Sequence, residues 1–376
     1  MTEITAQTQW KRTGLVLARN AEGYGAHVVG DPCVVWDSEL SAWRMVLFYD
    51  RPGHGTSISH DPSAAPGTWA TPTPLDFTNP ELLPAGGGTH KPFIVSDAHE
   101  PNQASFVDGR YWLVTVSFTG NSREKRVQRA WSTSLAGPWT LEPEELISRG
   151  APGAFDENHV DAVSGYWLEE TGEFIYYYMG YPLQPQPWAH SPYGNAIGVV
   201  TQKPGGRTVA HGVMLNPSDT EGHWASGYLG GFQLLDGSHP AMKPLAAGHR
   251  WVAVLNASPT PPRRDGELTS EEPAPSLGGL AFSDADSPVE GWELAPEPFE
   301  WIEQIPADAI AAGEGVNLWR QHLIVTPDAT RLLYNSGFYG EEQMYSKLLR
   351  CPEVARQVPG RSLKRDPAFT PVGLRS

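Results

Sequence analysis

Apolar and polar residues alternate along most of this chain in short runs, and turns rich in glycine, proline or acidic residues separate the runs. Short alternating runs that contain many Tyr, Trp and Val residues are typical of half-buried β-strands rather than helices. Residues 161–181 illustrate the pattern, because two such runs flank a turn at Gly172. The pattern predicts an all-β protein.

The same group of strands recurs along the chain and closes after a glycine-containing turn, as at Trp69, Trp139 and Trp292. A repeated unit of strands without long helices is typical of a β-propeller. The last unit lacks a closing strand, which we expect residues 10–18 of the N-terminal segment 1–25 to supply. We predict one domain with five four-stranded antiparallel blades, at about residues 27–75, 90–142, 156–205, 226–295 and 313–350.

The composition agrees with many turns and an ample core, since 376 residues include 39 Gly and 35 Pro, and 40% are hydrophobic. A formal net charge of −16 argues against nucleic acid or an anionic membrane as a partner, because both require a basic surface. No segment resembles a signal sequence or a bilayer span, so we expect a cytoplasmic protein. Cys33 and Cys351 fit two free thiols, with a single disulfide as the alternative. The oligomeric state is not readable from the sequence.

One face of such a ring is the expected place for a functional site. In a four-stranded antiparallel blade, the entry to the first strand and the connection between the second and third strands lie on the same face. These connections are elaborated here, and long loops on a rigid scaffold commonly carry sites. They cover residues 51–55, 119–126, 182–194 and 258–276.

Acids, histidines and amides lie at or near the predicted blade entries, which converge on the axis of the ring. The candidates for binding a small molecule are His90, Glu100, Asn102, His159, His223, Trp224 and Asn317. The histidines lack the spacing of a metal site, so we expect neither a metal nor a cofactor. Basic residues beside the first two long loops form a candidate anion site, with solvated loop charges as the alternative. These are Arg51, His54, Arg123, Lys125, Arg126 and Arg129.

Several segments resemble the five-bladed glycoside hydrolases that include the family 43 arabinanases and xylosidases, with families 32 and 130 as relatives. The resemblance rests on the order of "GDP" at Asp31, "EPNQASFVDGRYWLVTVSF", "RAWSTSLAGPWT", "VDAVSGYWLEETGEFIYYYMG" and "GEGVN". It implies that a carboxylate base and a carboxylic acid hydrolyse a small glycoside or oligosaccharide with inversion.

By this resemblance, Asp31 is the general base, and Asp161 orients the sugar and raises the pKa of the acid. The family's acid opens the fourth blade, where this chain has Glu221 a few residues before the aligned segment 226–228. The resemblance therefore implies a catalytic set of Asp31, Asp161 and Glu221, with Glu157 and Glu100 as replacement acids.

Two other functions stay open. Phosphorolysis would use the basic loop residues to bind phosphate, and a propeller without hydrolytic activity would bind or convert another metabolite. Departures from the family pattern favour the second alternative. The acid of blade four is displaced, and Val316 replaces a histidine that the family associates with a central calcium ion, so the resemblance supports no calcium site.

Overall fold

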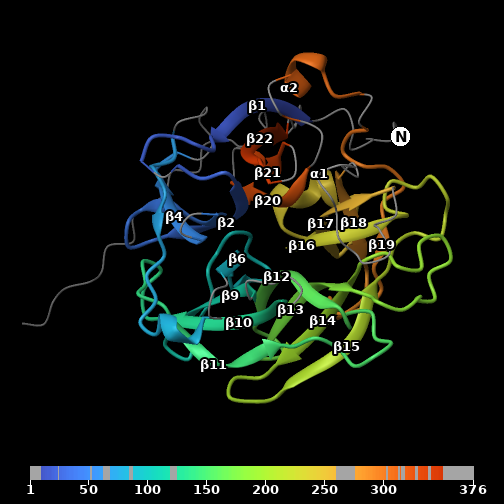
Figure 1. Cartoon of the computed structure of the whole chain (residues 1–376), viewed down its shortest axis with the longest axis horizontal. Helices are drawn as coiled ribbons and strands as arrows, with labels where there is room; N and C mark the ends of the chain where they lie inside the picture. The colour runs from blue at the N-terminus through green and yellow to red at the C-terminus, as the bar shows by residue number, and fades with distance from the viewer. Residues whose placement is uncertain are drawn as a thin grey trace, which may run out of the picture.

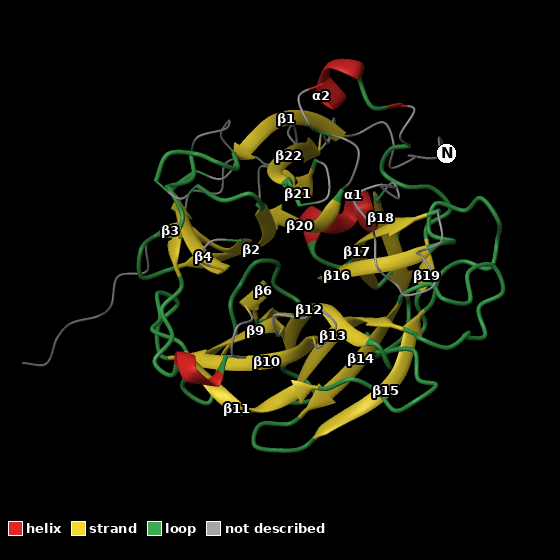
Figure 2. Ribbon diagram, viewed as in Figure 1, coloured by secondary structure: helices red, strands yellow, loops and turns green. Residues whose placement is uncertain are grey.

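The computed structural model describes residues 10–349 except 24, 51–52, 62–67, 84–87, 119–124, 260–275, 302–303, 312–313, 315–317, 327–328 and 338–339. Five largely antiparallel sheets surround a central axis (Figures 1 and 2). This arrangement confirms the predicted all-β, five-bladed propeller.

The strands of each blade follow one another from the axis outwards. Blade I contains β2 (Val29–Asp37), β3 (Ala42–Tyr49), β4 (Gly53–Ser59) and β5 (Thr73–Pro74). Blade II contains β6 (Gly88–Ile94), β9 (Arg110–Phe118), β10 (Lys125–Ser132) and β11 (Thr140–Ile147), with β8 (Phe106–Val107) beside β9. Blade III contains β12 (His159–Leu168), β13 (Glu173–Tyr181), β14 (Ala196–Gln202) and β15 (Thr208–Leu215), and β7 (Ser96–Asp97) pairs in parallel with β12.

Blade IV contains β16 (Tyr228–Asp236), β17 (Trp251–Ser258), β18 (Leu277–Ser283) and β19 (Glu293–Leu294). Blade V contains β20 (Trp319–Val325), β21 (Thr330–Ser336), β22 (Gln343–Leu349) and β1 (Trp10–Leu17). The helical segments of the described residues are short: η2 (Pro80–Leu82), η3 (Pro240–Met242), α1 (Lys243–Ala246) and α2 (Ala307–Ala311). In this part of the chain no helix has the length and apolar character needed to cross a membrane.

The ring is closed by the N-terminal strand. β1 pairs antiparallel with β22, from Trp10 opposite Leu349 to Leu17 opposite Met344. Arg12 of β1 also donates hydrogen bonds to the carboxylates of Glu300 and Glu314. The outer strand of the last blade, β1, therefore comes from the opposite end of the sequence and closes the ring.

The tryptophans that close the repeated unit belong to the packing of the blades. Trp139 is fully buried and Trp292 nearly so. Gly137 adopts a φ of 84°, and a Cβ atom at this position would lie 3.0 Å from the indole ring of Trp139. Glycine is required before this tryptophan because the turn is left-handed and the ring packs directly against the backbone.

All five inner strands contain the same β-bulge. Gly30 pairs with Phe48 and Cys33 pairs with Val46, so three steps along β2 match two along β3. The same one-residue shift occurs in β6, β12, β16 and β20. The first residue within each bulge has a positive φ, namely Asp31 (52°), Lys91 (54°), Ala162 (50°), Gly231 (54°) and Arg320 (45°). Bulges redirect side chains, and here they set the residues at each blade entry.

Candidate active site

Asp31 is held rigidly between blades I and V. Its backbone N–H donates to Oδ1 of Asn335 (2.7 Å), and Nδ2 of Asn335 donates to Oδ1 of Asp31 (3.0 Å). A Cβ atom at Gly30 would lie 2.3 Å from the Asn335 amide, so only glycine leaves space for this pair. Asp31 is buried, at 5% exposure. The Gly-Asp-Pro segment therefore presents one fixed carboxylate at the entry of blade I.

Asp161, at the entry of blade III, binds two ammonium groups. Lys91 donates to Oδ1 and Lys125 donates to Oδ2, each at 2.7 Å. Burial alone would raise the pKa of this carboxyl, but the charges of Lys125 and Lys91 hold the pKa well below its usual range. Asp161 is therefore an anion at neutral pH. Its two oxygens are engaged by lysines, an environment different from that of a carboxylate that holds up the pKa of a neighbouring acid.

Two neutral histidines adjoin this carboxylate. Nε2 of His90 lies 3.4 Å from Oδ1 of Asp161, but burial and the charge of Lys91 lower the pKa of His90 well below its usual value, so the contact is not an ion pair. Burial and the charge of Lys125 lower the pKa of His159 to about 3. The His159 ring lies over Tyr181 with centroids 3.8 Å apart, and its Nδ1 has no hydrogen-bond partner among the described residues.

Half-buried aromatic rings surround the two histidines. Phe48 and Phe118 lie 5.9 and 5.0 Å from the His90 ring, measured between centroids, and Tyr181 covers His159. These rings come from the ends of β3, β9 and β13, on the face of the blade entries. Apolar faces beside polar hydrogen-bonding groups are typical of small-molecule sites.

Glu342 is a further buried carboxyl on this face, at 4% exposure. It precedes β22 in the connection between the second and third strands of blade V, and its carbonyl accepts a hydrogen bond from the N–H of Val29 (3.0 Å). Burial raises the pKa of Glu342 to about 7, with a further increase from the charge of Asp31 and an opposing effect of Lys91. Glu342 is thus the acid near Asp31 that retains a proton around neutral pH.

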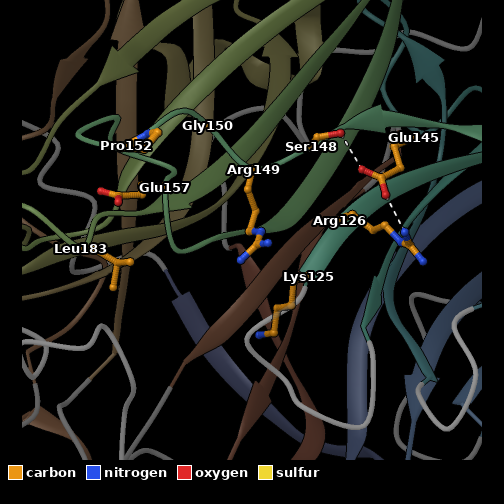
Figure 3. Close-up of a pocket in the computed structure, with 9 residues that line it drawn as sticks. All are labelled: Lys125, Arg126, Glu145, Ser148, Arg149, Gly150, Pro152, Glu157 and Leu183. Carbon is orange, nitrogen blue, oxygen red and sulfur yellow. Dashed lines mark hydrogen bonds and ion pairs between the residues drawn. The ribbon is translucent and has the colours of Figure 1, made fainter.

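A pocket of about 670 Å³ opens beside Lys125, between blades II and III. The charged residues around it, drawn in Figure 3, are Lys125, Arg126, Glu145, Arg149 and Glu157. Arg126 pairs with Glu145, and Oε2 of Glu157 accepts a hydrogen bond from the N–H of Gly153 (2.9 Å). The Lys125 ammonium therefore connects the pocket with Asp161.

Two residues predicted to bind substrate lie elsewhere. Asn102 is buried beside the parts of β2 and β20 that follow their bulges. Its Nδ2 donates to the carbonyls of Val34 (3.0 Å) and Leu323 (2.9 Å). It links the inner strands of blades I and V and serves the fold. Glu100 is 68% exposed and lies near His239, 4.0 Å away, in the loop that follows β7.

Three further predicted site residues, Glu221, His223 and Trp224, lie in the loop before blade IV, and none of them has a described contact with Asp31 or Asp161. Glu221 is exposed. Trp224 is fully buried and donates from Nε1 to the carbonyl of Ala295 (2.7 Å), while His223 is half-buried beside it. The entry of blade IV carries the glycines of residues 230–231 at its bulge, so it presents no acid there. Asn317 and Val316 lie outside the described residues.

Two residues of the predicted basic cluster, Arg129 and His54, are paired within the blades. The Arg129 guanidinium bonds to Glu142 (2.7 Å) and lies 4.4 Å from the Trp112 ring centroid, and Nε2 of the buried His54 contacts the Thr115 hydroxyl (2.9 Å). Lys125 and Arg126 do line the pocket. Arg51, Arg123 and Cys351 lie outside the described residues.

Lys91, Arg149 and Glu342 were not among the site residues predicted from the sequence. Lys91 occupies the bulge position of blade II that Asp31 occupies in blade I, a correspondence between "GDP" and "HKP" that an alignment of the blades by their bulges reveals. Glu342 follows Glu341 in a short connection, where two adjacent acids read as a solvated turn. The burial of Glu342 is what marks it as a candidate, and this burial is visible only in the folded structure.

The comparisons with known proteins agree with this architecture. No protein-family model and no curated protein matches the sequence. A solved family-43 glycoside hydrolase, described as thermostable, superposes with a TM-score of 0.58 at 14% identity, over 90% of this chain and 95% of the other. A structure titled simply "Glycoside hydrolase" gives a TM-score of 0.62 at 13% identity, over 95% and 94%.

Another similar structure is a xylan β-1,4-xylosidase from Bacillus halodurans, with a TM-score of 0.56 at 14% identity, over 94% of this chain and 61% of the other. At such identities the similarity shows a shared fold. The resemblance of this chain to the five-bladed propellers of glycoside hydrolases is thereby confirmed at the level of the fold.

Proposed function

We propose that the protein is a glycoside hydrolase whose active site lies at the blade entries, with Asp31 as general base and Glu342 as general acid. The observation that carries the proposal is the contrast between the two carboxyl groups. Asp31 is fixed by Asn335, whereas the pKa of Glu342 is raised to about 7. Hydrolysis of a glycosidic bond requires one carboxyl group that carries a proton and a second one that is placed to activate water.

The two carboxyl groups would have distinct roles in the reaction. Asp31 removes a proton from a water molecule as the water oxygen attacks the anomeric carbon, and Glu342 gives its proton to the departing glycosidic oxygen. In direct displacement the configuration at the anomeric carbon inverts. The aromatic rings around His90 and His159 provide faces for the sugar. Asp161 acts as a positioning residue, because it holds Lys91 and Lys125 in place.

The substrates to test first come from the similar structures, which include the xylosidase and an α-L-arabinofuranosidase from Podospora anserina (TM-score 0.52, 11% identity, covering 92% of this chain and 98% of the other). Purified protein is assayed on a panel of aryl glycosides that begins with xylosides and arabinofuranosides. Turnover by the wild type is expected, with a loss of about 10³-fold or more in Asp31→Asn. Inactivity of the wild type across a broad panel counts against the proposal.

The control for these assays is Glu341→Gln. Glu341 is 53% exposed, forms a surface ion pair with Arg19 (2.8 Å) and precedes Glu342 directly. Its substitution removes one carboxylate from the same connection without touching the buried one. Activity close to that of the wild type is expected in this variant.

A further inference from the structure

The charge around Asp161 is unbalanced. One buried carboxylate binds two ammonium groups, and the neighbouring His90 and His159 are neutral, so neither adds a charge. With the charged residues of the adjoining pocket included, the described residues provide four cations and three carboxylates. Within this set, which does not include Asp31 and Glu342, the positive charges exceed the negative ones by one, in a protein whose formal net charge is −16.

This excess is held in partly buried groups. The side chains of Lys91 and Lys125 are 18% and 15% exposed. Removing an ammonium group from water is unfavourable unless an anion compensates it. The described protein residues supply one carboxylate for the two lysines, so an anionic ligand is the natural complement of the site.

Two cations are directed to the pocket. Lys125 and Arg149 both line it, and Figure 3 shows the Arg149 side chain above that of Lys125 among the residues drawn. Arg149 is exposed and has no ion pair with any residue that the structure describes. The charges of both residues act on His159, whose Nδ1 lacks a hydrogen-bond partner in the described part of the chain although the residue is only 3% exposed. A buried polar atom without a partner in the protein requires one from outside it, such as water or a ligand group.

We infer that this pocket binds the carboxylate of an acidic sugar between Lys125 and Arg149, so that the substrate is an anionic glycoside. The volume of about 670 Å³ fits a sugar residue and exceeds what a small inorganic anion needs. Inorganic phosphate offers the same oxyanion chemistry and would instead serve phosphorolysis. The inference rests on the proposed function for the sugar, whereas the oxyanion site rests on the charges alone.

The test is isothermal titration of the full-length protein with galacturonate, glucuronate, their neutral parents galactose and glucose, and inorganic phosphate in separate runs. The wild type is compared with Arg149→Gln and with Arg207→Gln, an exposed arginine on the turn between β14 and β15 with the same change of charge. Because Arg149 is exposed, its substitution leaves the fold intact, which circular dichroism verifies.

We expect at least one acidic sugar to bind about 10-fold or more tightly than its neutral parent, with affinity falling as salt increases. Arg149→Gln should abolish this preference and Arg207→Gln should preserve it. Equal binding of acidic and neutral sugars, or equal effects of the two variants, overturns the inference. If the wild type binds phosphate, loses that binding in Arg149→Gln and shows no preference for acidic sugars, the site is a phosphate site. This result also overturns the inference. Because binding needs no turnover, a protein that binds an acidic sugar but hydrolyses no aryl glycoside, including aryl glucuronides and galacturonides, contradicts the proposed function and leaves the binding site supported.

Discussion

Asp31 and Lys91 occupy the same position in neighbouring blades, at the left-handed residue of the inner-strand bulge, with φ angles of 52° and 54°. One repeated backbone feature thus presents an anion at blade I and a cation at blade II. Lys91 then binds Asp161 of blade III, and its charge also acts on Glu342 before β22. The bulges of blades I and II and the entry of blade III thus bring charged groups to the face on which Glu342 of blade V also lies.

The activity should decrease as the pH rises through about 7. The general acid must carry its proton, and burial raises the pKa of Glu342 to about 7. The measurement is kcat/KM against pH on an aryl xyloside or whichever glycoside the wild type turns over. Glu342→Gln should lose this alkaline decline together with most of the activity, whereas Glu341→Gln should retain both. An alkaline limb that survives in Glu342→Gln would assign the titration to another group.

Replacement of Asp161 by asparagine should destabilise the protein strongly, because Lys91 and Lys125 would remain close together without their carboxylate. Loss of one partner from a buried ion pair costs about 3–5 kcal/mol. Urea denaturation of Asp161→Asn measures this loss. Asp108→Asn is the matched control, since Asp108 is exposed in the turn before β9 and has the same side chain. A loss no greater than that of the control would show that the lysines do not need the carboxylate.

The strand β1 should contribute much of the stability of the ring. Arg12 bonds to Glu300 and Glu314, and Lys347 of β22 donates to Glu300 (2.9 Å) with its side chain only 3% exposed. Arg12→Ala leaves these carboxylates short of a partner and should cost about 2 kcal/mol in the free energy of unfolding. The neighbouring Lys11 is exposed, so Lys11→Ala serves as the control.

Deletion of residues 1–18 removes all of β1 and should lower the melting temperature by many degrees. The cause is the loss of the ladder with β22 in addition to the Arg12 contacts. Differential scanning calorimetry of the shortened and full-length chains provides the measurement. An unchanged melting curve would mean that blade V is stable without its outer strand.

His99 should make stability depend on pH at the contact between blades III and IV. Its Nδ1 lies 2.6 Å from Asp236 and its Nε2 lies 3.0 Å from Glu170. Burial lowers the pKa of His99, but the two carboxylates outweigh it and raise the pKa above the usual value. The stabilisation is therefore fully present below the unfolded pKa of about 6.5 and is lost as the pH rises through the folded pKa.

Substitution of His99 by asparagine tests this contact. The difference in melting temperature between wild type and variant should be larger at pH about 5.5 than at pH about 8.5. Because His99 is 36% exposed in its side chain and Glu170 is 48% exposed, the effect should stay near or below about 1 kcal/mol. A difference that does not change with pH would show that the charge of the imidazolium adds nothing.

The sequence predicted the ring but only part of the site. The first two strands of blade III, β12 and β13, have runs of apolar residues on either side of the Gly172 turn, and these runs are recognisable in the sequence. The outer strand β15 escaped prediction because most of its residues are exposed and lack alternation. An edge strand of this kind is defined by its pairing with β14, which the local sequence does not encode.

The site residues were likewise predictable only in part. Asp31 and Asp161 lie at blade entries, where the repeat directed attention. Asn102 and Trp224 also lie near strand starts in the sequence, but only the fold shows that they bond to backbone carbonyls inside the protein. Glu342 was not foreseeable, because its role depends on burial and on the charge of Asp31, more than three hundred positions away in the chain.

The pairing of Asp31 with Glu342 as base and acid is tested most directly by the dependence of hydrolysis on the leaving group in Glu342→Gln. The dinitrophenolate of a dinitrophenyl glycoside leaves without being protonated, whereas the methanol or phenol of a methyl or unsubstituted phenyl glycoside needs a proton from the acid in order to leave. We expect Glu342→Gln to lose about 100-fold or more in activity on glycosides with poor leaving groups and less than about 10-fold on the dinitrophenyl glycoside, while Asp31→Asn is impaired on all of them. Equal losses of Glu342→Gln on good and poor leaving groups, or full activity on both, would contradict it.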